Sequence, residues 1–474
     1  MRISNEKNDN FYNYMSIKII KSEHYEQNLS INREAKLLYG EILTPFTLID
    51  DMFDMLPKKI FSDPEKKWLD AGAGTGFFSM RLYWRLDEGL SSVIIDKEER
   101  HNHIIENMIS LSELRHENIL KLREIFGEKA NIFEGNFLEL KGNYDYIIGN
   151  PPYNCNGIKK VPTNSKLSKK RDGQTIWMAF VRHSVKLLRE KGSLLVIIPA
   201  IWMKQDKARM YHFITSYKIK KLKCLTNTET NRYFNGEAQT PTSYFHLIKE
   251  PTDNIIDLYD KDLKKYISYP FAEGEPIPVF GASVLKKIKR KENQIQFPKV
   301  YKTNMPSKTI SLNKCYSKVH PYKNIRTTIL SKLDAKLVIE YSNKPMAFYG
   351  KKKLIMGHKM YGFPFIDYKG EYGISNRDNY VIVSDDQEVL ERLCEFFSNK
   401  LALYLFETTR YRMKYLEKYI FQLLPDITKL PDVPSNLTNE TLYDYFGLTD
   451  EERKSVENLH KKDYSFKIKN SQYL

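Results

Sequence analysis

Residues 69–78 read Leu-Asp-Ala-Gly-Ala-Gly-Thr-Gly-Phe-Phe, and this stretch decides the fold that the sequence predicts. The apolar residues before it indicate a buried strand, and those after it indicate the start of a helix. Glycines at positions 72, 74 and 76 allow a tight turn and let a ligand approach bare backbone. The spacing is GxGxG without a following Walker lysine, which favours a small nucleoside ligand over a dinucleotide or ATP. A plain strand-to-helix turn is the alternative.

Short apolar runs alternate with helical stretches on both sides of this turn. We expect buried strands over Lys67–Ala71, Ser92–Ile95, Asn131–Glu134, Tyr144–Gly149 and Leu194–Ile198, and helices over Phe77–Leu86 and Trp177–Leu188. This alternation predicts a Rossmann-like α/β domain, in which helices cover both faces of a doubly wound parallel sheet.

The pattern changes after Glu250, where Pro, Asp and Tyr become frequent and indicate a connection to a second domain. Mixed short segments over 281–383 predict an α+β region, and helical spacing returns over 387–424. Thr449-Asp450-Glu451-Glu452 has the form of a capping box, which predicts a short terminal helix. We therefore divide the chain into an N-terminal extension (1–35), an α/β domain (36–250), an α+β domain (251–438) and a helical tail (439–474).

The composition points to a polyanionic partner. The 474 residues include 75 Lys and Arg against 59 Asp and Glu, a formal net charge of +16, so nucleic acid is the first candidate, ahead of an anionic membrane. A Lys-rich composition from an AT-biased genome explains the charge equally well. The four cysteines are scattered without a CxxC pair, which excludes a disulfide scaffold and a cysteine zinc site and favours a reducing compartment.

No stretch of the sequence is typical of a membrane span or a secretion signal. The longest strongly apolar run, Leu194–Met203, is far shorter than the roughly 20 residues that a span needs. The N-terminal residues lack the uninterrupted apolar segment of a secretory signal. We expect a soluble, cytoplasmic monomer that binds no metal.

An acidic candidate lies where the second expected strand ends, in Ile94-Ile95-Asp96. In nucleotide-binding α/β folds, a carboxylate at this place accepts hydrogen bonds from ribose hydroxyls. Capping of the following helix is the alternative role for Asp96, and one side chain can serve both.

The most informative stretch ends another expected strand and reads Asp-Tyr-Ile-Ile-Gly-Asn-Pro-Pro-Tyr over residues 145–153. Its two prolines stop the strand, fix the backbone and remove two N–H donors. The side-chain carbonyl of Asn150 and the backbone carbonyl of Pro151 can then accept both hydrogens of one NH2 group, and Tyr153 offers a face for base stacking. Two such acceptors draw the nitrogen lone pair out of conjugation, so the nitrogen can attack an electrophile without a catalytic base. A Pro-rich turn with a capping Asn is the alternative.

Together these motifs resemble the gamma class of S-adenosylmethionine-dependent DNA adenine-N6 methyltransferases, including those of type II restriction–modification systems. The resemblance runs from Tyr39 to Lys249 and implies S-adenosylmethionine as the cofactor and duplex DNA as the partner. It implies that the cofactor is bound by Thr44, Pro45, Phe46, Asp70, Ala71, Gly72, Gly74, Asp96, Asn136, Phe137 and Asn150. It implies catalysis by Asn150, Pro151, Pro152 and Tyr153, with Phe234 against a flipped target base. Asn136 replaces the acid usual in the family, and its side-chain carbonyl can still accept from the cofactor adenine.

Two basic runs are candidates for DNA contact. The stretch from Cys155 to Arg171 has no acid, and its basic residues include Lys159, Lys160, Lys169, Lys170 and Arg171. A second run opens the region that holds target recognition in the gamma class, with Lys286, Lys287 and Arg290. We expect both runs to contact DNA phosphates, whereas a solvated charged surface is the alternative for each.

The leading hypothesis is therefore site-specific methylation of adenine N6 in duplex DNA. Methylation of a protein glutamine amide or of RNA, and DNA binding by a methylase fold that has lost activity, are the alternatives. No nuclease motif is visible in the sequence, so a separate restriction endonuclease as a partner is left open.

Overall fold

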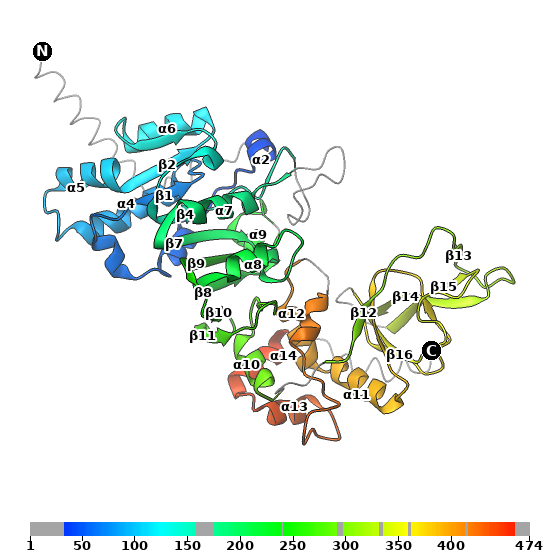
Figure 1. The fold of residues 1–474 in the computed structure, drawn as a ribbon. Coiled ribbons are helices and arrows are strands. Elements are labelled where there is room, and N and C mark those ends of the chain that lie inside the picture. Colours follow the sequence, from blue (N-terminus) through cyan, green and yellow to red (C-terminus); the bar gives the residue numbers. More distant parts are fainter. Residues whose placement is uncertain are drawn as a thin grey trace, which may run out of the picture. The chain divides into compact units, whose positions relative to one another are not determined.

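The computed structural model describes residues 33–157, 174–238, 240–291, 297–330, 335–358, 362–412 and 416–459 (Figure 1). The chain divides into two compact units. Unit 1 contains Met1–Tyr259 and Ser268–Gly274, and unit 2 contains Asp260–Ile267 and Glu275–Leu474. The boundary expected after residue 250 falls near the end of a strand, Thr242–Pro251, so unit 1 extends further along the chain than the sequence suggests.

Unit 1 is built on a mixed sheet of nine strands in the order β11-β10-β8-β9-β7-β4-β1-β2-β3. The strands are β1 (Trp68–Ala71), β2 (Ile109–Glu113), β3 (Asn131–Glu134), β4 (Tyr144–Gly149), β7 (Leu188–Pro199), β8 (Tyr217–Leu225), β9 (Thr242–Pro251), β10 (Ile255–Asp260) and β11 (Lys265–Pro270). β1 pairs in parallel with β2 and β4, β2 with β3, and β4 with β7. β9 runs antiparallel to both of its neighbours, β7 and β8. The expected Rossmann-like α/β fold is thus confirmed, but the sheet is mixed rather than parallel throughout.

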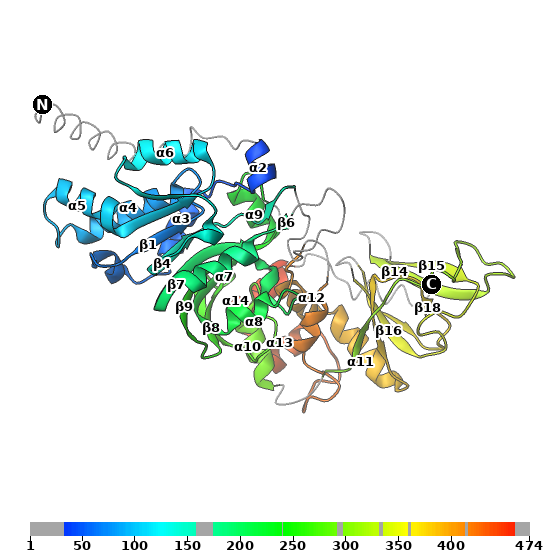
Figure 2. The same ribbon diagram turned by 45° about the horizontal axis from the view of Figure 1, so that its top comes forward.

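Helices pack against this sheet, and α7 lies along β7 in Figure 2. Among its described residues, the helices of unit 1 are α2 (Arg33–Tyr39), α3 (Phe46–Phe53), α4 (Phe77–Leu90), α5 (Lys97–His103), α6 (His116–Phe126), α7 (Trp177–Leu187), α8 (Met210–Thr215) and α9 (Asn227–Tyr233). α4 begins directly after the glycine-rich turn, with Gly76 as its N-cap. Its apolar residues recur at helical spacing and are buried, which explains why this stretch forms a helix against β2.

The strand expected over Ser92–Ile95 is wrong. These residues form a turn between α4 and α5, with Val93 51% exposed and Ile95 83% exposed. The place beside β1 is taken by β2, whose Ile109 and Leu111 are buried. The helices α4 and α5 both lie between β1 and β2, so the strand that pairs with β1 comes later along the chain than expected.

The core of unit 1 is centred on the first strand. Trp68 is fully buried, and its ring stacks on Phe61 at 5.5 Å and on Tyr146 at 4.2 Å between ring centroids. In the neighbouring strands β4 and β7, Ile147, Ile148 and the residues 194–198 are almost completely buried. Strands buried on both faces fix the positions of the loops at their carboxyl ends.

Unit 2 combines two small sheets with helices, as the α+β expectation states. The sheets are ordered β12-β19-β16-β17 and β13-β15-β14-β18. Their strands are β12 (Val300–Lys302), β13 (Leu312–Asn313), β14 (Tyr322–Leu330), β15 (Ala335–Ser342), β16 (Lys353–Gly357), β17 (Phe365–Asp367), β18 (Gly373–Ile374) and β19 (Asn379–Val383). The helices are α10 (Ala282–Lys291), α11 (Gln387–Ser398), α12 (Lys400–Thr408), α13 (Asn439–Phe446) and α14 (Asp450–Leu459). The predicted capping box is present, because the Thr449 N–H donates to Glu452 at 2.8 Å and the Glu452 N–H donates to Thr449 Oγ1 at 3.4 Å.

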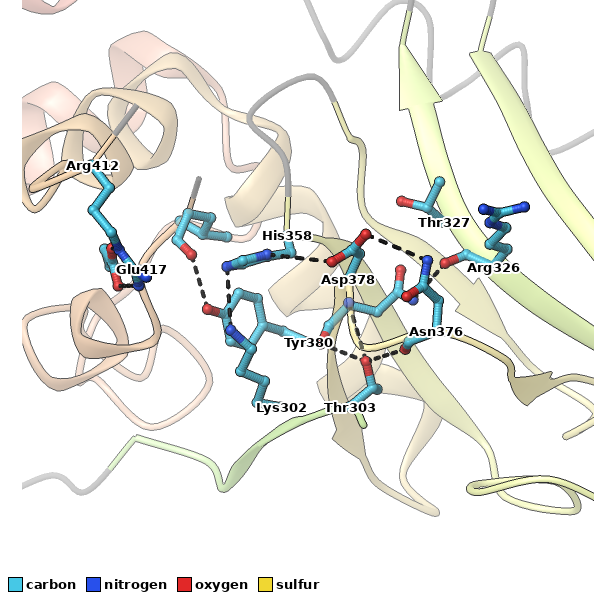
Figure 3. A network of polar contacts seen from close by, with 12 residues as sticks. Lys302, Thr303, Arg326, Thr327, His358, Asn376, Asp378, Tyr380, Arg412 and Glu417 are labelled. Carbon is cyan, nitrogen blue, oxygen red and sulfur yellow. Dashed lines mark hydrogen bonds and ion pairs between the residues drawn. The ribbon is translucent and has the colours of Figure 1, made fainter. Parts of the chain in front are cut away.

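A polar network fixes the first sheet of unit 2 (Figure 3). Lys302 points toward His358, with 3.3 Å between Nζ and Nε2. Thr303 donates from Oγ1 to the carbonyl of Asn376 at 2.6 Å, which anchors the turn before β19. The Tyr380 hydroxyl donates to the Leu416 carbonyl at 2.9 Å. Burial and the nearby Lys302 lower the pKa of His358 to about 4, so this imidazole is neutral at pH 7.

Candidate active site

A pocket of about 380 Å³ opens at the carboxyl ends of the central strands of unit 1. It lies where β1, β2, β3 and β4 end, as expected for a doubly wound α/β sheet. The stretches predicted from the sequence meet here, because the residues that line the pocket include Thr44, Gly72, Gly74, Asn136, Phe137, Asn150, Pro151, Pro152 and Tyr153. The glycine-rich turn and the Asn-Pro-Pro-Tyr motif therefore form one site.

The glycine-rich turn offers bare backbone to this pocket. Gly72 and Gly74 have φ of +80° and +56°, a conformation that favours glycine. A Cβ at Gly74 would meet no atom within 4 Å, so the space above it is open to a ligand. Gly76 serves packing instead, because a Cβ there would lie 3.0 Å from Leu122 and 3.1 Å from Phe126.

Glu113 is the acid that the sequence analysis missed. It ends β2 and lines the pocket. Its Oε1 accepts from the N–H groups of Leu114 at 2.9 Å and Arg115 at 2.8 Å, and its Oε2 accepts from Gly74 at 2.7 Å. Burial raises the pKa of Glu113, and these N–H donors oppose the shift. The carboxylate thus joins the end of β2 to the glycine-rich turn.

Asp96 does not reach this pocket. It is the N-cap of α5, where its Oδ1 accepts from the N–H groups of Glu98 at 3.0 Å and Glu99 at 2.8 Å. The capping alternative is therefore its observed role. Glu113 holds the position at the end of the second strand that the sequence analysis gave to Asp96, and the signal for it is the apolar alternation of Ile109–Glu113 just before a helix.

Asp70 and Ala71 lie beneath the pocket rather than on its wall. Asp70 is completely buried at the end of β1, and Ser79 of α4 donates from Oγ to its Oδ2 at 2.7 Å. Its Oδ1 has no hydrogen-bond partner in the part of the chain that the structure describes. Burial raises the pKa of Asp70 to about 7, against the Ser79 hydrogen bond that lowers it. Asp70 therefore supports the turn and does not line the ligand cavity.

The Asn-Pro-Pro-Tyr corner is held by the end of β4. Gly149 has φ of +147° and packs so closely on β1 that a Cβ would lie 3.0 Å from the Ala71 carbonyl oxygen. Asn150 follows at once and donates from Nδ2 to Thr44 Oγ1 at 3.0 Å. Its Oδ1 is buried and has no partner among the described residues. This acceptor is the one the sequence predicts for an NH2 group.

The remaining wall comes from the ends of β3 and α7. Asn136 lines the pocket, and its Oδ1 accepts from the Leu138 N–H at 3.1 Å to cap a short 3-10 turn. Phe137 stacks on Phe180, with 4.7 Å between centroids and 24° between planes. These rings give one side of the pocket an apolar, aromatic surface.

Residues 68–234, from the start of β1 to the end of α9, match the family described as Eco57I restriction-modification methylase. This segment is therefore similar to restriction-modification methylase domains. The methylase resemblance predicted from the sequence is thus confirmed for this segment, and so is its α/β fold.

Individual relatives match only a short part of the chain. The type II methyltransferase M.TthHB8I of Thermus thermophilus is 35% identical over 74 residues, 13% of this chain and 17% of that protein. An uncharacterized adenine-specific methylase of Mycoplasma pneumoniae is 33% identical over 72 residues, 15% of this chain and 17% of that protein. This chain therefore spans less than a fifth of the length of these relatives. The solved type IIL restriction-modification enzyme MmeI in complex with DNA shares 12% identity at a TM-score of 0.46, covering 92% of this chain and 77% of MmeI.

Besides Asp70, Ala71 and Asp96, three further predicted residues do not line the pocket. Pro45 is the N-cap of α3, and Phe46 is buried against Phe77, with 4.9 Å between ring centroids. Phe234 is 4% exposed and belongs to the hydrophobic core that also contains Leu225 and Tyr244. Its predicted contact with a target base stays a prediction.

The predicted DNA contacts divide into two groups. Lys159, Lys160, Lys169, Lys170 and Arg171 lie outside the described residues. Of the second run, Lys287 donates from Nζ to the Gly447 carbonyl and to Glu452 Oε2, both at 2.6 Å. Glu452 is 3% exposed, so this ion pair fixes α10 to α14. Lys287 is a packing residue here, while Lys286 and Arg290 lie on the same helix.

Two further observations concern metals and membranes. Within the described ranges, no group of three or more His, Cys, Asp or Glu residues could hold a metal ion. No helix in the described ranges is both long and apolar enough to cross a membrane.

Proposed function

We propose that this protein transfers a methyl group from S-adenosylmethionine to N6 of an adenine flipped out of duplex DNA. The observation that carries the proposal is the unsatisfied Oδ1 of Asn150, buried in the wall of a cavity whose other wall is the glycine-rich turn. Buried acceptors without a partner are rare, and at a cavity they indicate a missing ligand donor. An exocyclic NH2 group is such a donor.

The residues present fit the proposed cofactor. The backbone at Gly72 and Gly74 is open for close approach, and Glu113 stands at the end of β2, where it can accept from ribose hydroxyls. Asn136 and the Phe137–Phe180 pair suit the adenine end. When bound, the cofactor supplies an electrophilic methyl group on a sulfonium sulfur.

The chain's own residues then orient the nucleophile. In the proposal, Asn150 Oδ1 and the Pro151 carbonyl accept the two hydrogens of adenine N6, and Tyr153 stacks on the base. The nitrogen lone pair would face the glycine-rich turn. As the N–CH3 bond formed, the bond between the methyl group and sulfur would break, and one N6 proton would then leave to water. Because the nitrogen needs no prior deprotonation, the absence of a histidine or cysteine from the residues that carry this step is not an obstacle.

Base flipping requires DNA contacts that offset a few kcal/mol of lost stacking and pairing. The net charge of +16 favours such contacts, and the basic stretch after the catalytic corner is the first candidate to make them. The relatives named type II methyltransferase and adenine-specific methylase support DNA and adenine as the target.

The decisive experiment offers labelled S-adenosylmethionine with duplex DNA, RNA or protein to the purified full chain. We expect label on DNA, located on adenine by methylation-sensitive sequencing. Label on protein or RNA would favour the glutamine-amide or RNA alternative, and cofactor binding without transfer would favour an inactive DNA-binding methylase fold.

Asn150→Ala should lower kcat by about 10²- to 10³-fold, the effect of removing one preorganised hydrogen-bonding group. Asn107→Ala is the matched control, since Asn107 is exposed and lies outside the pocket. Wild-type turnover in Asn150→Ala would contradict the catalytic assignment.

A further inference from the structure

The side chain of Asn150 has two chemically different ends, and the structure partners only one of them. Its Nδ2 donates to Thr44 Oγ1 at 3.0 Å, whereas its Oδ1 stays unpaired at the pocket. Thr44 is 3% exposed and lies just before α3, far from Asn150 in the sequence. The residue that fixes the amide therefore comes from a different segment than the catalytic corner.

We propose that Thr44 is a positioning residue that holds the Asn150 amide with its carbonyl oxygen toward the target nitrogen. This inference rests on the proposed function. An asparagine amide has a donor end and an acceptor end of almost the same shape, and a half-turn exchanges them. With Thr44 as acceptor for Nδ2, the carbonyl oxygen faces the pocket. In the exchanged orientation, Nδ2 would present its own hydrogens to the adenine NH2 group and could not accept from it.

Thr44 can do this because its segment is pinned to the chain after the catalytic corner. The N–H groups of Asn156 and Gly157 donate to the carbonyls of Leu38 at 3.0 Å and Leu37 at 2.9 Å. Gly40 has φ of +73°, and a Cβ there would lie 2.1 Å from the Asn154 carbonyl oxygen. The close approach at Gly40 thus holds the α2–α3 connection against the residues that follow Tyr153.

A second clamp fixes the other side of the same connection. Glu41 accepts from the guanidinium of Arg115 and from Asn118 Nδ2, the latter at 3.3 Å. Arg115 also lies over the ring of Tyr39, 5.5 Å from its centroid. Because Arg115 follows Glu113 closely in sequence, the connection that carries Thr44 is tied both to the end of β2 and to the catalytic corner.

The competing role for Thr44 is direct cofactor binding, which the family resemblance implies. The two roles differ in what a lost hydroxyl changes. If Thr44 binds the cofactor, loss of its hydroxyl should raise the dissociation constant of S-adenosylmethionine and leave kcat at saturation intact. If Thr44 positions Asn150, loss of the hydroxyl should lower kcat at saturation and leave cofactor affinity nearly unchanged.

The test compares Thr44→Val, which keeps the shape but removes the hydroxyl, with Thr44→Ser, which keeps the hydroxyl. We expect Thr44→Val to lower kcat on duplex DNA by about tenfold, the worth of one hydrogen bond, with Thr44→Ser near wild type. Calorimetric titration of S-adenosylmethionine should give similar affinities for all three proteins. Unchanged kcat in Thr44→Val, no rescue by Ser, or an effect confined to cofactor affinity would overturn the proposal.

A variant away from the amide provides an independent check. Gly40→Ala should displace the connection and lower kcat as Thr44→Val does, while Gly447→Ala, also at positive φ but with open space around it, should not. Equal kcat in Gly40→Ala and wild type would count against the pinning. If the wild-type chain methylates no DNA, the proposed function itself fails. If it methylates DNA and Thr44→Val and Gly40→Ala have the same kcat as wild type, only the positioning role fails.

Discussion

Replacing the buried carboxylate under the glycine-rich turn should make the protein more stable at alkaline pH. Asp70 is 0% exposed, and Ser79 Oγ at 2.7 Å is its one side-chain partner among the described residues. Burial raises its pKa to about 7, and the nearby Glu113 carboxylate adds to the shift. Asp70→Asn keeps an oxygen for Ser79 and removes the charge, so it resembles the protonated state of Asp70.

The size of this change in the free energy of unfolding follows from the difference in the pKa of Asp70 between the unfolded and folded chain. An Asp that titrates at 3.8 when unfolded and at about 7 when folded binds its proton more tightly in the folded state. Its contribution to stability is therefore complete below pH 4 and falls by about 1.4 kcal/mol per pH unit up to pH 7. The full loss is about 4 kcal/mol. Relative to wild type, Asp70→Asn should gain up to this amount at pH 8 and about nothing at pH 4.

Urea denaturation followed by tryptophan fluorescence measures this in unit 1 alone, because all four tryptophans (Trp68, Trp84, Trp177 and Trp202) lie there. His246 acts in the opposite direction. Burial, with a smaller effect from Lys221, lowers its pKa to about 4, so its contribution to stability is lost as pH falls from 6.5. The pH dependence of the free energy of unfolding of the wild type contains both effects. Only the difference in this free energy between Asp70→Asn and wild type isolates the effect of Asp70.

Asp96→Asn is the matched control for this experiment. Asp96 is exposed, and asparagine also caps helices, so Asp96→Asn should not show the gain in stability at pH 8 that Asp70→Asn shows. An Asp70→Asn protein whose stability relative to wild type is no greater at pH 8 than at pH 5 would refute the buried, proton-binding carboxylate.

Two further predictions test single side chains. Glu113→Ala should weaken binding of S-adenosylmethionine by about tenfold or more, because a buried site loses a charged hydrogen-bonding group. Asp96→Ala is the control and should leave the affinity unchanged. Equal affinities of Glu113→Ala and wild type in calorimetry would show that Glu113 is no ligand. Lys287→Ala should destabilise unit 2, because it leaves the buried Glu452 without its ion-pair partner. The slope of the logarithm of DNA affinity against the logarithm of salt concentration should stay as in wild type. A slope reduced by about one would instead make Lys287 a phosphate contact.

The Asn-Pro-Pro-Tyr corner and the glycine-rich turn could be predicted from the sequence because local backbone chemistry determines them. Two consecutive prolines end a strand because they lack N–H donors, and they end β4 here. Three alternating glycines form a turn that few other residues permit. The parallel strands that precede these turns then bring them to one edge of the sheet. For the same reason Asn150 and Gly72 meet at the pocket although the chain between them is long.

Glu113, the acid at the end of β2, could not be found in this way. Its position depends on which apolar run forms the second strand, and two runs compete before residue 115. The burial of Ile109 and Leu111 beside β1 decides between them, and that burial is a tertiary property. The hydrogen bond between Thr44 and Asn150 is equally nonlocal, since it joins two segments on opposite sides of β1 in the sequence.

The prediction of DNA contacts from basic runs is limited in the same way. A basic run predicts a DNA contact only if its cations are not already paired, and pairing depends on the fold. In α10, Lys287 and Lys289 are bound by Glu452 and Glu275, so this run offers less free charge than its sequence suggests. Over the described residues of 297–358 the balance differs, because Glu340 is the one acid there and it pairs with Arg326. Exposed cations in that stretch include Lys308, Lys314, Lys318, Lys323, Lys336, Lys344, Lys351 and Lys352. Among these described residues, positive charge without a neighbouring acid is therefore more frequent over 297–358 than on α10, and we expect a phosphate backbone to be attracted more strongly to that stretch than to α10.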